Sequence, residues 1–443
     1  MTTERLNGLD TAFLSLERAA TPMQLGALAL FRPSRPTSAA QVAGLLAERV
    51  CGVPRLRHIV RRSWFPPGSA IWIEDPRFRP EDHIHVHHLD GGGATGAAEL
   101  TSQLMARPLP RDRPLWELHV MSGFDADRFG VLVAFHHAFA DGLGGLEIGI
   151  ALLDDVAGAS LRRARTRSDG DRPGPEPGTR RLADAARQFA AETGESLGIA
   201  ASVLRSARLP APGSPLMISS SGRRGLALAG MDLAQVRRIR MRYGGTANDV
   251  MLAVVAGALR QWIEGRGQPV DGLTLRALIP VSSRARSGSR APGNQMSGYL
   301  CDLPVGEPDP VLRLRSIRQA MERSKAAGTR RGPGAIPLLA AQLPPALHRV
   351  AAPAAGQAAS LLFDLLVTSV PLPGVPLRLA GAELGEVYPV PPLAPSHALS
   401  VAMSSYRGSA YVGLHVDRDA MPDLDGLAAA FPASARALDP LAR

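Results

Sequence analysis

The chain has 443 residues, of which 45% are hydrophobic and 20% charged, and its formal net charge is +10. This length suggests two or three domains of about 100–200 residues each, and the apolar content excludes a fully disordered protein. The two cysteines, Cys51 and Cys301, are too few for a disulfide-stapled secreted fold. No zinc-finger spacing, aromatic–basic RNA motif or basic helix entering heptads is present, so we expect no nucleic-acid partner.

The N-terminal segment places Glu4, Asp10 and Glu17 among its apolar residues, which is not the pattern of a signal peptide. No stretch approaches about 18 uncharged apolar residues, the length that a membrane-spanning helix needs. We therefore expect a cytoplasmic protein whose contact with a membrane is peripheral. The net positive charge favours association with an anionic surface.

The first part of the chain, residues 1–160, contains two clear strand signals. Residues 115–120 place Leu115, Glu117 and His119 on one face and Trp116, Leu118 and Val120 on the other, which predicts a strand with one exposed face. Residues 130–135 form a short apolar run, which is typical of a buried strand.

A change of composition follows the first part. Residues 161–181 are basic, interrupted by Pro and Gly and almost free of apolar side chains, which indicates a linker. Residues 182–204 have apolar side chains at helical spacing. We therefore predict that a linker and an amphipathic helix, at 161–215, separate the first domain from a second domain at 216–443.

The second part also mixes helices and strands. Asn248 is placed to cap a helix that is apolar almost all round and therefore central. Residues 311–328 predict another helix with one apolar face, and 410–416 alternate like a strand. Because strands and helices interleave in each part, the predicted fold class is α/β (α+β), with two sandwich domains rather than one doubly wound sheet.

The clearest chemical motif is HHAFADG, at residues 136–142, directly after the predicted buried strand. A histidine there can act as a general base because its pKa lies near neutral pH. The glycines after Asp141 allow a sharp turn and a close approach of substrate. The motif therefore favours catalysis over a purely structural role. Two adjacent histidines and one aspartate do not supply a good three-ligand set, so we expect no metal.

Other segments accompany this motif: LD…FL…E…PM…G at 9–26, PRLR at 54–57, WIEDPRF at 72–78, PLPRDRPLWE at 108–117, ND at 248–249, PVSSR at 280–284, GNQ…S at 293–297, LAGAELGEVYP at 379–389 and SYRG…VDRDAMPDL near the C-terminus. HHxxxDG marks the coenzyme A-dependent acyltransferase superfamily. With these segments, the chain resembles its bacterial wax ester synthase/diacylglycerol acyltransferase family from about residue 6 to 427. One segment and one further position depart from that family's pattern. Residues 368–373 read TSVPLP where the family usually has SNVPGP, and Gln24 stands where it commonly has His.

The resemblance implies two chloramphenicol-acetyltransferase-like domains with an active-site tunnel between them. It also implies direct transfer, without an acyl-enzyme, of a long-chain acyl group from acyl-CoA to diacylglycerol or a fatty alcohol. No cofactor is expected beyond acyl-CoA as co-substrate. The expected partners are acyl-CoA, a lipid alcohol and a peripheral membrane or lipid-droplet surface, and a monomer is expected because both halves of the site lie in one chain.

The resemblance also assigns roles to residues. His137 is implied as the general base, Asp141 as an architectural partner of Arg284, and His136 as a residue that packs or hydrogen-bonds locally. Five residues are candidates for substrate binding: Gly142, Asn248, Asn294, Ser297 and Trp116. The residues themselves leave alternatives open, since a helix cap suits the Asn248 position, a turn suits Asn294, and a core position suits Trp116.

Two other functions stay open at this point. The altered segment at 368–373 is compatible with an acyltransferase of specialised metabolism that acts on a non-lipid hydroxyl or amine. A non-catalytic homologue that binds lipid or a partner is the third alternative, and the intact HHxxxDG motif argues against it.

Overall fold

The computed structural model describes residues 4–63, 69–124, 128–154, 214–282, 294, 296–327 and 362–441. The predicted linker and helix at 161–215 lie outside these residues except for the last two, and Arg284 also lies outside them. Within the described part, no helix is both long enough and apolar enough to cross a membrane.

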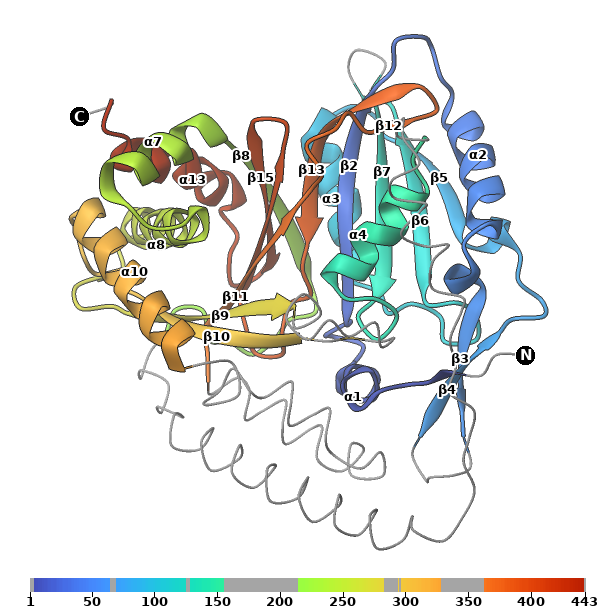
Figure 1. Cartoon of the computed structure of the whole chain (residues 1–443), viewed down its shortest axis with the longest axis horizontal. Helices are drawn as coiled ribbons and strands as arrows, with labels where there is room; N and C mark the ends of the chain where they lie inside the picture. The colour runs from blue at the N-terminus through green and yellow to red at the C-terminus, as the bar shows by residue number, and fades with distance from the viewer. Residues whose placement is uncertain are drawn as a thin grey trace, which may run out of the picture.

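The first of two six-stranded sheets carries the HHxxxDG motif and stands at the right of Figure 1. Its strands are antiparallel except for the edge pair, β5 and β6. In sheet order they are β12 (Arg378–Leu379), β13 (Ala382–Val390), β2 (Gln24–Arg32), β7 (Phe129–His136), β6 (Trp116–Ser122) and β5 (Ile84–His88).

Helices cover both faces of this first sheet. On one face lie α2 (Ala39–Cys51) and α4 (Gly142–Ala151), and on the other lies α3 (Gly93–Met105). This half is completed by α1 (Gly8–Leu16), the 3-10 turns η1 (Pro54–Arg57) and η2 (Pro80–Asp82), and a small sheet of β1 (Glu4–Arg5), β4 (Ala70–Glu74) and β3 (His58–Arg62).

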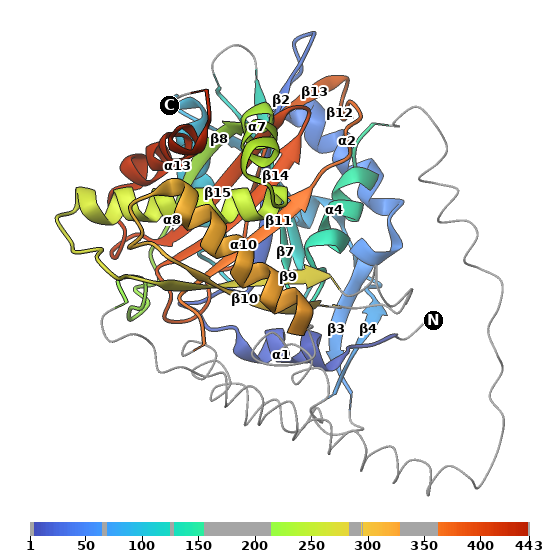
Figure 2. The same cartoon turned by 60° about the vertical axis from the view of Figure 1, so that its left-hand side comes forward.

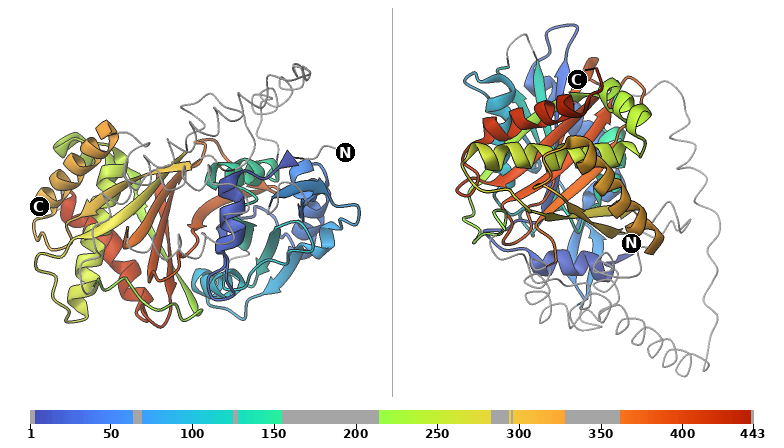
Figure 3. Two further views of the ribbon diagram at one scale, coloured as in Figure 1. Left: turned by 90° about the horizontal axis from the view of Figure 1, so that it is seen from below. Right: turned by 90° about the vertical axis from the view of Figure 1, so that its left-hand side faces the viewer.

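The second six-stranded sheet mixes parallel and antiparallel pairs. In sheet order it contains β10 (Met296–Leu303), β9 (Leu275–Ser282), β11 (Leu365–Pro371), β14 (Leu399–Tyr406), β15 (Ser409–Asp417) and β8 (Arg224–Asp232). Figure 2 shows the helices on its outer face, which are α7 (Leu233–Tyr243), α8 (Ala247–Gly265), α10 (Pro310–Ala327) and α13 (Leu424–Leu438). Seen from below, the two halves lie side by side (Figure 3). The predicted α/β (α+β) fold with two sandwich-like halves is confirmed.

Most elements predicted from periodicity are present. The strands expected at 115–120 and 130–135 are β6 and β7, the helix at 311–328 is α10, and the strand at 410–416 is β15. One detail differs, because the face of β6 that was expected to be exposed is covered. His119 is only 2% exposed, since the imidazoles of His85 and His87 on β5 lie against it.

The helix predicted after Asn248 is α8, and its interior is buried as expected, but its cap was assigned to the wrong residue. Thr246 is the N-cap: its hydroxyl accepts a hydrogen bond from the Asp249 N–H, and the Asp249 carboxylate accepts one from the Thr246 N–H. A hydroxyl paired with an acid three residues later satisfies two free N–H groups at once. Asn248 lies inside the first turn, where it cannot do this.

Each half of the chain contributes an element that packs with the sheet of the other half. β13 belongs to the second part by sequence, yet it pairs with β2 of the first sheet over seven residue pairs. In return, α3 of the first part packs against β8 of the second sheet. Residues 378–390 therefore lie in the first sheet, although the predicted boundary places them in the second domain. A shared core between the sheets includes Leu30, Leu226 and Val390.

Candidate active site

The HHxxxDG motif connects β7 to α4. His136 is the last residue of β7, and α4 begins at Gly142. Asp141 is the N-cap of α4, since its side chain accepts a hydrogen bond of 2.7 Å from the Gly144 N–H. This bond fixes the turn that follows the histidines, and Asp141 itself is only 2% exposed. Asp141 is thus architectural in this structure, while its implied partner Arg284 is not among the described residues.

His137 is held by contacts to three separate segments. Its backbone N–H donates to the Met23 carbonyl at 2.7 Å, its own carbonyl accepts from the Asn294 side-chain amide at 2.6 Å, and its ring stacks on Phe13 with centroids 4.0 Å apart. Within the described chain, Nδ1 has no hydrogen-bond partner. Burial lowers the pKa of His137 to about 4. The imidazole is therefore neutral at pH 7, but its pKa lies below the near-neutral value expected from the sequence, because the ring is buried.

His136 lies in a different environment. Its ring is fully buried, its Nδ1 accepts a hydrogen bond from the Ala138 N–H at 2.9 Å, and its Nε2 lies 3.4 Å from a Glu17 carboxylate oxygen. That carboxylate also accepts from the Met23 N–H and from Arg111. Burial alone would raise the pKa of Glu17, but the contacts with His136 and Arg111 outweigh it and lower the pKa to about 2. His136 therefore ties the motif to the N-terminal segment.

A buried amide joins the second half of the chain to His137. The Asn294 side chain and backbone N–H groups both donate to an Asp10 carboxylate oxygen, and the Asn294 carbonyl accepts from the Asn7 side chain at 3.0 Å. Burial raises the pKa of Asp10 to about 6. Asn294 thus connects α1 to the carbonyl of His137, a residue 157 positions away in the sequence.

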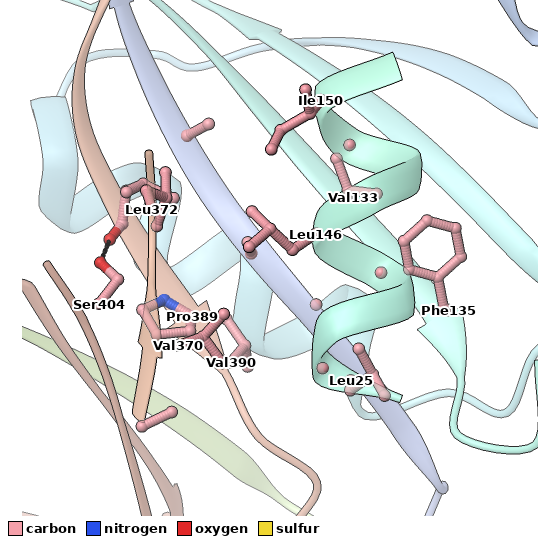
Figure 4. Close-up of a pocket in the computed structure, with 18 of the residues that line it drawn as sticks. Leu25, Val133, Phe135, Leu146, Ile150, Val370, Leu372, Pro389, Val390 and Ser404 are labelled. Atoms are coloured by element: carbon pink, nitrogen blue, oxygen red, sulfur yellow. Dashed lines mark hydrogen bonds between the residues drawn. The ribbon is translucent and has the colours of Figure 1, made fainter. Parts of the chain in front are cut away.

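An apolar cavity of about 210 Å³ lies between α4, the first sheet and β11 (Figure 4). His137 is the only titratable side chain among the described residues that line it. Gly142, Gly145 and Gly149 of α4 also line it, and their spacing of three and four residues places them on one helix face. Leu146 and Ile150 of the same helix also line the cavity (Figure 4), so glycine backbone and apolar side chains together form its helical wall.

The remaining predicted residues are distributed differently. Ser297 lies on β10 with its hydroxyl buried, next to Met296, which lines the cavity. Asn248 is half-buried in the first turn of α8 and does not line the cavity. Trp116 is 1% exposed, donates its indole N–H to the Leu56 carbonyl at 2.7 Å and stacks on His83, so it packs in the core. The structure therefore brings His137 and Gly142 together at the cavity, with Asn294 holding His137.

Four residues of this site were not predicted as functional: Asp10, Phe13, Glu17 and Met23. They form part of the N-terminal segment on which the family resemblance rests. The signal that could have found them is the presence of two acids, Asp10 and Glu17, inside an otherwise apolar run. Buried acids need hydrogen-bond partners. Asn294 supplies them to Asp10, and the Met23 N–H, Arg111 and His136 supply them to Glu17.

Comparison with known proteins identifies the family of the chain. The family model of the wax ester synthase/diacylglycerol acyltransferase catalytic domain matches residues 6–251, and that of the WS/DGAT C-terminal domain matches residues 292–439. The chain belongs to this acyltransferase family. It is 32% identical to a Mycobacterium tuberculosis protein named a probable diacylglycerol O-acyltransferase, with 96% of this chain and 93% of that one covered. A second such protein from M. tuberculosis is 29% identical, with 97% of each chain covered.

Solved structures share the fold. The wax ester synthase/diacylglycerol acyltransferase of Marinobacter aquaeolei VT8 superimposes with a TM-score of 0.71, at 23% identity, with 99% of both chains covered. The first condensation domain of the CDA synthetase superimposes with a TM-score of 0.60, at 15% identity, with 100% of this chain and 97% of that one covered. The prediction of an acyltransferase of this family is confirmed.

Proposed function

We propose that the chain transfers a long-chain acyl group from acyl-CoA to the hydroxyl of diacylglycerol or a fatty alcohol. One observation carries the proposal: among the described residues, the only titratable side chain lining an apolar cavity is a buried, neutral histidine, His137. An apolar cavity favours an acyl chain because binding removes its surface from water. The names of the relatives, diacylglycerol O-acyltransferase and wax ester synthase, support the same substrates.

The chemistry follows from the state of His137. Its neutral ring takes the proton of the acceptor hydroxyl as that oxygen attacks the thioester carbonyl. The resulting tetrahedral oxyanion collapses, the ester C–O bond remains, and the C–S bond breaks. The leaving thiolate then receives the proton from the imidazolium, which restores the base and releases free CoA. Stacking on Phe13 orients the imidazole, and the hydrogen bonds of the His137 backbone with Met23 and Asn294 hold the residue in place.

The proposal needs no resident cofactor, because the base is a side chain and the acyl group arrives activated as a thioester. We further propose that the acceptor reaches the cavity from a cytoplasmic membrane or lipid-droplet surface to which the chain binds peripherally. The net charge of +10 supports binding to anionic lipid. Flotation with vesicles tests this: the protein should float with anionic vesicles and remain behind with neutral ones or at high salt.

The departures at 368–373 bear on which acceptor is used. Ser369, where the family usually has Asn, is exposed and does not line the cavity, whereas Leu372, where the family usually has Gly, does. Thr368, where the family usually has Ser, also lines the cavity and keeps a hydroxyl. The differences that reach the cavity are therefore differences of size, and they add no new polar group for a non-lipid acceptor.

The test is release of CoA thiol from palmitoyl-CoA in three arms: hexadecanol, diacylglycerol and no acceptor. We expect release that depends on a lipid alcohol and is lost in His137→Ala. His88→Ala is the matched control, because His88 is an exposed histidine on β5 outside the cavity. Release without acceptor, or equal rates in wild type and His137→Ala, contradicts the proposal. If folded protein releases no CoA in any arm, lipid alcohols are rejected as acceptors, and a non-lipid hydroxyl or amine becomes the acceptor to test.

A further inference from the structure

A cluster of imidazole and carboxylate groups lies at the outer edge of the first sheet, formed by His85 on β5 and by Glu117 and His119 on β6. His119 Nε2 is 3.3 Å from one Glu117 oxygen, and His85 Nε2 is 4.0 Å from the other. The two imidazoles stack with centroids 5.1 Å apart. One ligand atom from each of the three side chains lies within 4.8 Å of the other two.

The strand pattern explains why these groups meet. β5 and β6 are parallel, and His85 stands opposite His119 in the register. Successive side chains of a strand point to opposite faces, so Glu117 and His119 share one face of β6. Leu118, between them, lines the cavity on the other face. The cluster is therefore separated from the candidate active site by the thickness of the sheet.

We propose that His85, Glu117 and His119 bind a divalent transition-metal ion, with Zn²⁺ as the best match to two imidazoles and one carboxylate. Ligand atoms around tetrahedral zinc lie about 3.3–3.4 Å apart. The Glu117–His119 separation already has this value. The three ligand atoms lie within 4.8 Å of one another, so His85 must move closer by up to about 1.4 Å. Its side chain is 39% exposed and so has room to do so.

The surroundings of the cluster fit a metal site in two further respects. His87 places its Nε2 3.2 Å from the Nδ1 of His119, which leaves Nε2 of His119 as the atom facing Glu117. Such an outer hydrogen bond commonly fixes the tautomer of a metal-binding histidine. Side-chain exposure also rises from 3% at His119 through 19% at Glu117 to 39% at His85, which provides a path for entry and an open position for water.

Arg107 opposes cation binding, since its charge acts on both Glu117 and His85. A bound ion would join the edge strand β5 to β6 and stabilise the fold without entering the reaction. The expectation of no metal, reached from the HHxxxDG motif, considered only His136, His137 and Asp141. This proposal does not depend on the proposed function, because the cluster faces away from the cavity.

The experiment titrates chelator-treated, full-length protein with Zn²⁺ against a chromophoric chelator and records the thermal midpoint with and without zinc. We expect one zinc per chain and a higher midpoint with zinc. Affinity should fall by more than tenfold in Glu117→Gln and His85→Ala, and by about tenfold or more in His87→Ala. His88→Ala, on the opposite face of β5, should bind like wild type, and Arg107→Gln should bind more tightly.

His119→Ala is not used as the main test, because His119 is buried and the variant could fail to fold. His85 is half-exposed, so His85→Ala tests the same site with less effect on folding. Circular dichroism checks that each variant is folded. Absence of stoichiometric zinc binding by wild type at micromolar concentration overturns the proposal. Unchanged affinity in both Glu117→Gln and His85→Ala also overturns it, because the zinc would then be bound elsewhere, for example at His136 and His137.

Discussion

The two faces of the first sheet differ in chemistry at β6, whereas at β7 both faces are apolar. On β7, Val131, Val133 and Phe135 line the cavity, whereas Leu132 and Ala134 pack with α3 on the other face. On β6, the cavity face holds Leu118 and the other face holds the imidazole and carboxylate cluster. The alternation of a strand thus separates an apolar ligand cavity from a polar cluster by one residue. A register slip of one position would exchange the two faces.

The same alternation separates the adjacent histidines of the motif. Phe135 and His137 line the cavity, while His136 is directed into the network around Glu17. Two identical side chains in sequence therefore have different surroundings and different expected roles. Substitutions at the two positions test most directly whether their roles differ.

The largest expected effect is at His137. His137→Ala removes the proposed base and should lower kcat/KM by about 10²–10⁴-fold. Its loss of stability should be smaller than that of His136→Ala, because the His137 ring borders an existing cavity. Steady-state CoA release and urea unfolding measure the two quantities on the same preparation. A variant that keeps more than a tenth of wild-type activity contradicts the assignment.

His136→Ala should show the reverse pattern, with a loss of stability as its main effect. The substitution empties a buried site and takes one partner from the Glu17 carboxylate, which costs about 1–3 kcal/mol in free energy of unfolding. Activity measured well below the unfolding transition should fall by less than in His137→Ala. Equal losses of activity at both positions, with unchanged stability, reject the separation of roles.

Asn294→Ala tests the contact that reaches His137 from the second half of the chain. Loss of the amide removes the hydrogen bonds to the His137 carbonyl and to Asp10, so the imidazole is oriented less well. We expect kcat to fall by about tenfold with little change in KM, because small misplacements at the reacting centre mainly slow the chemical step. A change confined to KM argues instead for a role in binding.

The pH dependence of kcat/KM tests whether the buried His137 acts as a neutral base. Because burial lowers the pKa of His137 to about 4, its basic form is fully populated from pH 6 to 8, and the profile should be flat there and decline only toward acid. An ordinary histidine would decline below about pH 6.5. The pKa of Asp10 is raised to about 6, so Asp10 could also cause a decline in this range. An Asp10→Asn variant removes its contribution to the profile. A decline near pH 6 that persists in this variant contradicts the neutral-base assignment.

The smallest effect is expected at Leu372. Leu372→Gly enlarges the cavity and should raise the relative kcat/KM for longer acyl chains by about tenfold or less. Val375→Gly is the matched control, because Val375 is an exposed apolar residue close by in the sequence. A parallel change in both variants indicates a general effect of glycine on the loop rather than an effect of cavity size.

The sequence predicts those parts of the site that are contiguous. His137 and Gly142 could be placed because strand, histidines and turn follow one another directly. The contact of Asn294 with His137 depends on packing between distant segments, so the asparagine could be nominated only through the resemblance. Trp116 shows that the resemblance can also mislead, because this residue of a family segment packs in the core and does not line the cavity. The segment at 379–389, which contains most of β13, served only the family resemblance, and nothing in it says which sheet the strand joins.

The placement of β13 has a consequence for how the protein is made. On a ribosome, β2 emerges about 350 residues before its neighbour β13. At about 5–20 residues per second, roughly 20–70 s pass during which one edge of β2 lacks its partner. An uncovered strand edge is prone to pair with other chains. Newly synthesised protein truncated before β13 should therefore aggregate, and the two halves should not be separable into independently expressed pieces.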